Sequence, residues 1–520
     1  MRPGYVAKRL VGLARFARNA RGFLDEQLTV DQIRQEIAEG VRTREQRFLN
    51  KLTAFYQRPH SPHFRLLAAA GCEQGDIRRL VETDGLESTL TQLAQAGVYL
   101  AYEEFKGRMP AKRGSQTFHF GAGDFEDPNL EPELFGSSGG TRGKPTQSAG
   151  SLAYMRQMVP HWGIFLIEND CLDIPLTFWT PGHAGATSRY LCCAKFGQKC
   201  THWFVSEEMS AAKDRFYARC RQYVVRRETG LVRPISASYD EPGVVLDTML
   251  PMLADGRATM NTAPSAAVKM SLAAQQRGRS LAGLTFLLGA EPLTPERKAA
   301  IEASGARATP LYGASEATWI GGQCRNAEHA DEVHALRDNY GLIRNPHSPT
   351  DANGADSILL TSLQPLNQKV LLNTDIGDRA VMRERACDCE YHRLGCTTIL
   401  HTIRSSDKIT EYGVNFAVAD VFRVLEDKLP GKLGGVAGDY QLVEWRDSDG
   451  LPRYTLNVHP RLPERPAEQI ADAFYTALSP MQSYYGYMVQ IFRKERVLQV
   501  ERAEPIRTGR SKLFPFLRRA

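Results

Sequence analysis

The sequence lacks several features that would place it in common classes of protein. No apolar run approaches the roughly 18 residues that a membrane-spanning helix needs, so no transmembrane segment is expected. Neither sign of charge predominates, because the chain has 65 Lys and Arg and 59 Asp and Glu. A net charge of +6 on 520 residues does not indicate a general nucleic-acid binder. No fixed-period repeat or low-complexity tract is present, and the composition is that of a globular protein.

The beginning of the sequence does not resemble a targeting signal. Its first 24 residues contain six Lys or Arg but no acid and no Ser. Apolar residues at helical spacing, from Val6 to Ala17, predict an amphipathic surface helix. The absence of Ser disfavours a transit peptide, and a secretory signal would need a continuous apolar core. The ten cysteines form no compact framework and are typical of reduced thiols or metal ligands. We therefore expect a cytoplasmic protein.

Patterning along the chain predicts an α/β fold with a large and a small domain. Residues 1–130 read as a helical region that forms part of the large domain. Residues 131–404 alternate helices with apolar strands, which is typical of layered sheets with parallel pairing. The expected strands are 175–179, 282–288, 357–363 and 369–372. The pattern of residues changes at about residue 405, and residues 405–520 are expected to form a small α+β domain. Its expected elements are a glycine turn and helix within 413–428, a hairpin at 440–444 and 454–458, a helix at 466–478 and a strand at 487–492.

The most informative stretch runs from Phe135 to Thr146 and is rich in Gly, hydroxyl side chains and cations. Glycine lets backbone N–H groups turn toward an anion, so such a loop can cradle phosphates. It is not a P-loop, because Ser138 stands where the first Gly belongs and Pro145 follows Lys144. A kinase-type phosphotransferase is therefore disfavoured. A Ser/Gly turn without a ligand remains the alternative reading of this stretch.

Further polar motifs follow strand-like runs, where ligands bind in α/β sheets. Gly289-Ala290-Glu291 comes after one such run, and Tyr312-Gly313-Ala314-Ser315-Glu316 after the next. Tyr can stack on a base, Ser can donate to a phosphate, and Glu can hold Mg²⁺, which prefers oxygen ligands. Ile376-Gly377-Asp378 could accept from ribose hydroxyls, and Arg404 lies at the expected domain boundary. A basic tail carries Lys512, although such a tail is usually only solvated.

The order of these motifs resembles the adenylate-forming superfamily of acyl-CoA ligases, adenylation domains and luciferases. The phenylacetate–CoA ligase-like branch is the most similar, and the resemblance covers about Phe135 to the C-terminus. It implies a large N-terminal adenylate-forming domain and a small mobile C-terminal domain. The implied activity is ATP-dependent conversion of a carboxylic acid to acyl-AMP, with release of pyrophosphate. A thiol of CoA, or of a carrier protein's phosphopantetheine, would then accept the acyl group.

The resemblance also implies roles for single residues. Lys512 would bridge the carboxylate and the α-phosphate, while Ser315 would contact that phosphate and Glu316 would hold Mg²⁺. Asp378 and Arg404 would hold the ribose. The remaining ATP contacts would come from the glycine loop, the adenine-pocket turn and the base-stacking motif: Ser138, Gly139, Thr141, Gly143, Lys144, Gly289, Ala290, Glu291, Tyr312 and Gly313.

Departures from the family pattern keep other readings open. The phosphate loop is one residue longer than usual, with Arg142 where Thr is common, and the hinge Asp407 stands one place late. A non-catalytic nucleotide-binding protein on the same fold is therefore an alternative. Transfer to an amine instead of a thiol is another. A homodimer is also compatible with the sequence.

Cysteine suggests a second site between the motifs. Cys387 and Cys389 follow Ile-Gly-Asp, while Cys324 and His329 follow Tyr-Gly-x-Ser-Glu. Because these motifs converge in one region, three thiolates and an imidazole could surround Zn²⁺ tetrahedrally. The resemblance also implies a structural zinc in this place. The alternative ligands are Cys396, His392 and His334, and unliganded cysteines in a loop are the other reading.

Overall fold

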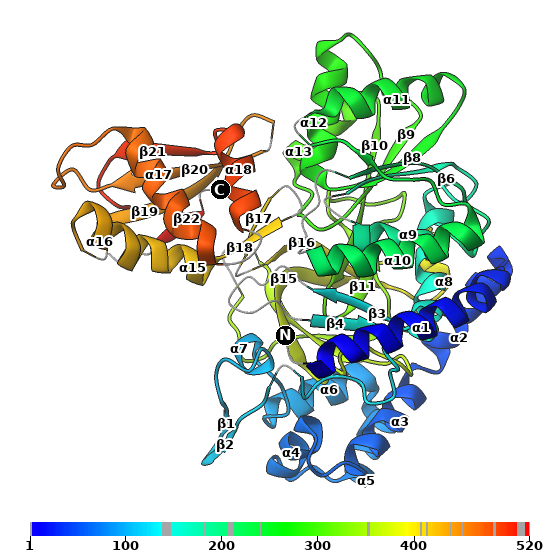
Figure 1. The fold of residues 1–520 in the computed structure, drawn as a ribbon. Helices are drawn as coiled ribbons and strands as arrows, with labels where there is room; N and C mark the ends of the chain where they lie inside the picture. Colours follow the sequence, from blue (N-terminus) through cyan, green and yellow to red (C-terminus); the bar gives the residue numbers. More distant parts are fainter. Residues whose placement is uncertain are drawn as a thin grey trace.

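A computed structural model describes most of the chain. The described residues are 3–121, 123–137, 147–180, 183–205, 212–239, 241–350, 354–405, 408–411, 414–436, 438–449, 451–481, 485–506 and 515–518. Among them, no helix combines the length and the apolar character that crossing a membrane requires. Figure 1 shows a large body with a smaller lobe beside it.

The N-terminal region is helical, as predicted. Its helices are α1 (Pro3–Asp25), α2 (Val30–Arg42), α3 (Arg44–Tyr56), α4 (Pro62–Ala69), α5 (Gln74–Asp84), α6 (Leu86–Gln95) and α7 (Tyr102–Phe105). Thr29 and Gln32 form a capping box that fixes the start of α2. A short hairpin, β1 (Ala111–Arg113) with β2 (Gln116–Phe118), follows α7. Helices α3 to α7 bury a core against the antiparallel part of the main sheet, whereas α1 and α2 pack into a second core with α8 (Leu152–Glu168) and β5 (Leu176–Thr180).

The main sheet has twelve strands, in the order β13-β14-β15-β16-β12-β11-β10-β9-β8-β5-β6-β7. Its strands are β5 (Leu176–Thr180), β6 (Cys200–Val205), β7 (Ile235–Ser236), β8 (Ala258–Thr262), β9 (Leu284–Leu288), β10 (Arg307–Ala314), β11 (Thr318–Gly322), β12 (Val333–Ala335), β13 (Tyr340–Arg344), β14 (Asp356–Ser362), β15 (Thr374–Glu384) and β16 (Thr398–Ser405). Strands β7 to β10 pair in parallel through β6, β5, β8 and β9. From β10 onward the pairing is antiparallel.

Helices connect and cover the strands of this sheet. They are α8 (Leu152–Glu168), α9 (His183–Ala194), α10 (Ala212–Thr229), α11 (Pro242–Ala254), α12 (Pro264–Gln276), α13 (Pro295–Glu302) and α14 (Glu390–Arg393). Strands β5, β8 and β9 are buried along their whole length, as parallel strands covered on both faces should be. The hairpin β3 (Leu134–Ser137) with β4 (Gln147–Gly150) flanks the predicted phosphate loop.

The predicted strands of the large domain are mostly confirmed. The apolar runs at 175–179, 282–288 and 357–363 become β5, β9 and β14. The predicted strand at 369–372 is wrong, because Lys369 makes only a single bridge to Glu126 and β15 begins at Thr374. Asn373 has a positive φ of 44°, which turns the chain. Its side chain donates to the carbonyls of Leu90 and Val98 and so holds this turn.

The small lobe is built on a four-stranded sheet in the order β21-β20-β19-β22. Its strands are β19 (Tyr440–Arg446), β20 (Pro452–Val458), β21 (Leu498–Arg502) and β22 (Phe516–Arg518). Its helices are α15 (Val418–Arg423), the π-helix η1 (Val424–Lys428), α16 (Leu429–Leu433), α17 (Ala467–Leu478) and α18 (Tyr485–Lys494). Strands β17 (Lys408–Glu411) and β18 (Val414–Ala417) form a hairpin before α15. Figure 1 shows the lobe beside α12, where Lys269 and Glu495 form an ion pair of 3.1 Å.

The small lobe confirms the predicted hairpin and helix but not the last strand. Tyr440 pairs with Val458 across the hairpin, and α17 covers the predicted helix. Residues 487–492 belong to α18 and not to a strand. Tyr485, Met488 and Phe492 are buried at intervals of three and four residues, which is helical spacing. The helix predicted within 413–428 begins at Val418, because residues 414–417 form β18.

Candidate active site at the carboxyl edge of the parallel strands

Two of the predicted nucleotide contacts, Tyr312 and Asp378, meet at the end of β10. The pairing of β10 with β11 shifts its register between Tyr312 and Gly313. Any side chain at Gly313 would overlap the carbonyl oxygen of Thr318, so this turn requires glycine. The Tyr312 hydroxyl donates a hydrogen bond of 2.9 Å to Oδ2 of Asp378. Burial, together with the neighbouring Asp378, raises the pKa of Tyr312 well above its usual range. Tyr312 therefore stays a neutral donor that orients the Asp378 carboxylate.

Asp378 and Arg404 lie on paired strands. Asp378 on β15 faces Ser405 on β16, and Arg404 faces Arg379. Gly377 has a positive φ of 87°, and a Cβ there would lie 2.9 Å from the ring of Tyr102. The glycine therefore allows α7 to pack closely against the strand that carries Asp378. Of the two predicted ribose contacts, Asp378 thus lies beside Tyr312, whereas Arg404 pairs one position further along β15.

Glu316 is buried and forms an ion pair with Lys106. The side chains are 8% and 10% exposed, and Lys106 comes from the segment that follows α7. The ammonium group also lies over the rings of Tyr102 and Phe105, about 5.4 Å and 5.5 Å from their centroids. A buried pair of this kind fixes both side chains, because separating the charges would leave each uncompensated. Ser315, beside Glu316, is exposed.

The turn after β9 presents its backbone and turns its carboxylate inward. Ala290 has a positive φ of 73°. The Glu291 carboxylate pairs with Arg297 at 3.1 Å and accepts from the amide and the hydroxyl of Ser265. These partners hold the carboxylate between the starts of α12 and α13. The backbone of Gly289 and Ala290 therefore forms the rim at this strand end, while the Glu291 side chain anchors the turn.

Several predicted site residues lie outside the described residues. They are Ser138, Gly139, Thr141, Gly143 and Lys144 of the phosphate loop, Asp407 of the hinge, and Lys512. The residues that the structure does bring to one region come from β10, β15, β16 and α7. Sequence reasoning missed Lys106. This residue belongs to the first 130 residues, which the family resemblance does not cover. No spacing in the sequence links Lys106 with a residue that lies 210 positions later.

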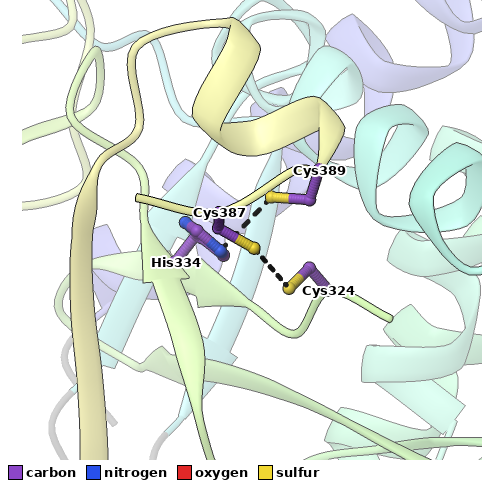
Figure 2. Close-up of side chains that lie close together, drawn as sticks. All are labelled: Cys324, His334, Cys387 and Cys389. Atoms are coloured by element: carbon purple, nitrogen blue, oxygen red, sulfur yellow. Dashed lines mark hydrogen bonds between the residues drawn. The ribbon is translucent and has the colours of Figure 1, made fainter. Parts of the chain in front are cut away.

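A cluster of three cysteines and one histidine lies beside this region. Its members are Cys324, His334, Cys387 and Cys389, whose ligand atoms all lie within 4.8 Å of one another. Figure 2 shows the four side chains pointing toward a common centre. The sulfurs of Cys324 and Cys387 are 3.8 Å apart, and the sulfur of Cys389 is 3.3 Å from Nε2 of His334. Tetrahedral Zn²⁺ would separate two sulfurs by about 3.8 Å and a sulfur from a nitrogen by about 3.6 Å.

The surroundings of the cluster also suit a metal. Nδ1 of His334 lies 2.7 Å from the carbonyl oxygen of Cys396. When Nδ1–H donates to this carbonyl, the lone pair of Nε2 points toward the sulfurs. Hydrogen bonds from Cys324 and His334 lower the pKa of Cys389 well below its usual range, which favours the thiolate form that binds metals. All the cysteines are free.

The fourth member of the cluster differs from the residue that we predicted. His334 on β12 faces Gly322 on β11, two residues before Cys324, and so reaches the three sulfurs. His329 lies in the preceding loop and stacks on His401, with ring centroids 3.8 Å apart. It groups with Glu328 and Glu332 instead. The strand register selects His334, and register cannot be read from cysteine spacing alone.

Comparison with solved structures agrees with this architecture. No family model matches the sequence, and no curated protein does so either. A crystal structure of 2-hydroxyisobutyryl-CoA ligase, in complex with 2-HIB-AMP and CoA in the thioesterification state, is similar at a TM-score of 0.54. The two are 14% identical, and the match covers 95% of this chain and 91% of that one. A mutant of the amide bond synthetase McbA from Marinactinospora thermotolerans aligns over 95% of this chain and 97% of its own, at 13% identity and a TM-score of 0.41. By the first of these likenesses, the chain shares the fold of the 2-hydroxyisobutyryl-CoA ligase.

Proposed function

We propose that the chain activates a carboxylic acid with ATP as acyl-AMP and then transfers the acyl group to a thiol. The carboxylate oxygen would bond to the α-phosphorus as pyrophosphate leaves, and the thiol would displace AMP from the acyl carbon. The observation that carries the proposal is the meeting of Tyr312, Asp378 and Glu316 at one edge of an adenylate-forming fold. Ligands of α/β sheets bind at this edge.

The described residues can each be given a part in binding the nucleotide. Tyr312 would stack on the base and orient Asp378, which with Arg404 would bind the ribose hydroxyls. The rim of Gly289 and Ala290 would border the adenine. Glu316 would supply the oxygen ligand that Mg²⁺ prefers, and its carboxylate is here paired with Lys106. When bound, Mg²⁺ would neutralise charge on the phosphates.

The remaining roles rest on the sequence prediction. Ser138, Gly139, Thr141, Gly143 and Lys144 would bind the outer phosphates, and Ser315 would contact the α-phosphate. Lys512, carried by the small domain of residues 405–520, would bridge the carboxylate and the α-phosphate. Two anions must approach each other in this reaction, so positioned cations would supply most of the acceleration.

For the acceptor, CoA is the first candidate. The 2-hydroxyisobutyryl-CoA ligase was solved with CoA, and it shares the fold of this chain over most of its length. A carrier-protein thiol and an amine are the alternatives. We also propose that Cys324, His334, Cys387 and Cys389 hold a structural Zn²⁺, because four protein ligands leave no open position. Zinc bound at this place in the sequence, between Glu316 and Arg404, would favour the phenylacetate–CoA ligase-like branch.

The test is to identify the products with a panel of carboxylic acids. The protein, ATP and Mg²⁺ are incubated with each acid, first alone and then with CoA or an amine. Acid-dependent AMP and pyrophosphate, with acyl-CoA formed only when CoA is added, support the proposal. Formation of ADP would instead indicate phosphoryl transfer. ATP binding without acid-dependent turnover over the whole panel would indicate a non-catalytic nucleotide-binding protein.

A further inference from the structure

Arg189 lies at the same edge of the sheet as the proposed site, but on the far side of β9 from Tyr312. It projects from α9, and its Nη1 donates to Oδ1 of Asn261 in β8. Its Nη2 would lie 3.5 Å from a Cβ built at Gly289. Asn261 and Gly289 lie at the carboxyl ends of β8 and β9. The guanidinium group therefore reaches the rim where ligands of parallel sheets bind.

Arg189 has no carboxylate partner among the described residues, whereas several other enclosed arginines of the chain have one. Arg297 pairs with Glu291, Arg44 pairs with Glu87, and Arg113 pairs with Glu104. The partner of Arg189, Asn261, is a neutral amide. Burial lowers the pKa of Arg189, and no carboxylate opposes that effect. Enclosing a cation without a counter-charge is unfavourable, and a bound anion would relieve this cost.

The position of Arg189 indicates which part of a ligand it would meet. Strands β8 and β10 are separated only by β9, so Asn261 and the Tyr312 turn are about 10 Å apart across the sheet. Ser315 and Glu316 follow the β10 end, where the proposed function places the α-phosphate and Mg²⁺ and where the acyl phosphate would form. A group held by Arg189 would thus belong to the distal end of the acid. After about 3 Å for the hydrogen bonds at each end, a short carbon chain or one ring fits the remaining span.

We propose that the acid is one that carries a second anionic group, which Arg189 binds. This inference rests on the proposed function and specifies the substrate class of the same site. The second anion takes no part in bond making or breaking, since only the carboxylate at the β10 end would attack ATP. Arg189 is then the specificity-determining residue, because its charge would be left unpaired by a monocarboxylic acid.

The test compares diacids with neutral analogues of the same length. Pyrophosphate release is measured with succinate, glutarate, adipate and isophthalate, each paired with its monomethyl ester. We expect the wild type to prefer at least one diacid to its ester by about 10- to 100-fold in kcat/KM, as for a hydrogen bond to a charged group. Arg189→Gln should abolish that preference, while Arg189→Lys, which keeps the charge, should retain part of it. Arg279→Gln, at an exposed arginine, is the matched control and should behave as the wild type.

The possible results separate this inference from the proposed function. Turnover of monoesters as fast as diacids, or the same ratio in wild type and Arg189→Gln, overturns the assignment of Arg189 and leaves acid activation intact. If no acid supports pyrophosphate release, the proposed function fails, and binding then decides the role of Arg189. In that case a diacid should raise the melting temperature of the wild type and of Arg279→Gln but not of Arg189→Gln. Absence of any shift would overturn the inference.

Discussion

The two halves of the twelve-stranded sheet use different means to assemble side chains. In the parallel half, strands β5, β8 and β9 are buried throughout, and the groups proposed for the site stand near the ends of the strands. In the antiparallel half, Asp378, Arg404 and His334 are brought into place by the register of paired strands. Strand β10 belongs to both halves. The turn that follows it therefore joins a rim for ligands to a framework that fixes catalytic groups.

The largest effect on stability should come from substitutions in the cysteine cluster. They test whether a metal stabilises the antiparallel half of the sheet. The wild type should contain about one zinc per chain by elemental analysis. Cys389→Ser should lose the metal and lower the free energy of unfolding by more than about 4 kcal/mol, in the range for loss of a structural metal. Cys72→Ser, at a cysteine outside the cluster, is the control. Wild type without zinc, or a Cys389→Ser protein of unchanged stability, would contradict the assignment.

The ion pair between Lys106 and Glu316 tests the junction of the two halves. Lys106→Met should lower the free energy of unfolding by about 3–5 kcal/mol, because it leaves the buried Glu316 carboxylate unpaired. The double variant Lys106→Met/Glu316→Gln should recover much of this loss but show no acid activation. The exposed pair of Glu39 and Arg42 provides a comparison, since solvent screens such a pair and Arg42→Met should leave stability almost unchanged. Equal effects of the two single substitutions on urea unfolding would refute the buried role of Lys106.

The helices that cover the antiparallel half should make its stability depend on pH. His63 is buried, and burial lowers its pKa to about 4. The unfolded chain has a histidine pKa of about 6.5, so it takes up the proton first as the pH falls. The stabilisation is complete above about pH 6.5 and is lost as the pH falls toward 4, to a total of about 3 kcal/mol.

Urea unfolding at pH 7.5, 5.5 and 4.5 measures this contribution. The slope of stability against pH should be smaller for His63→Gln than for the wild type. It should be unchanged for His119→Gln, since His119 is exposed. Parallel curves for the wild type and His63→Gln would show that His63 does not titrate differently on folding.

The smallest effect should come from the hydroxyl of Tyr312, which links β10 to β15. Tyr312→Phe keeps the ring for stacking but removes the hydrogen bond to Asp378. We expect ATP affinity to fall by about 10-fold, consistent with one hydrogen bond to a charged group, with little change in melting temperature. Tyr440→Phe, which removes a hydroxyl bonded to a backbone carbonyl in the small lobe, is the control. Unchanged ATP affinity in Tyr312→Phe would separate the tyrosine from nucleotide binding.

Strand ends were the most predictable part of the site, because they follow from apolar runs and the turns after them. β9 and its Gly289-Ala290 rim, and the hairpin of β19 and β20, were predicted from such patterns. The strand predicted at 487–492 failed because a short apolar run with buried Tyr485 and Met488 serves a helix equally well. Local pattern identifies an apolar face, but the neighbouring elements decide which structure buries it.

Partners from distant parts of the chain could not be predicted. Lys106 meets Glu316 because Gly377 lets α7 approach β15, and nothing in the local sequence marks that approach. His334 was one of several alternative ligands in the sequence, and it joins the cysteines because β12 pairs with β11 in one register. Arg189 lies within an ordinary helical pattern, and its place at the ends of β8 and β9 without a carboxylate among the described residues follows from the fold. These features are tertiary, so sequence patterns could not single them out.

The measurement that tests the central claim most directly is acid-dependent exchange of labelled pyrophosphate into ATP. It reports the reversible formation of acyl-AMP without requiring the acceptor to be known. We predict exchange with at least one carboxylic acid, abolished in Lys512→Ala and in Glu316→Gln while both proteins remain folded. Exchange that continues undiminished in both variants, or none with any acid for a folded wild type, would contradict adenylation at this edge of the sheet.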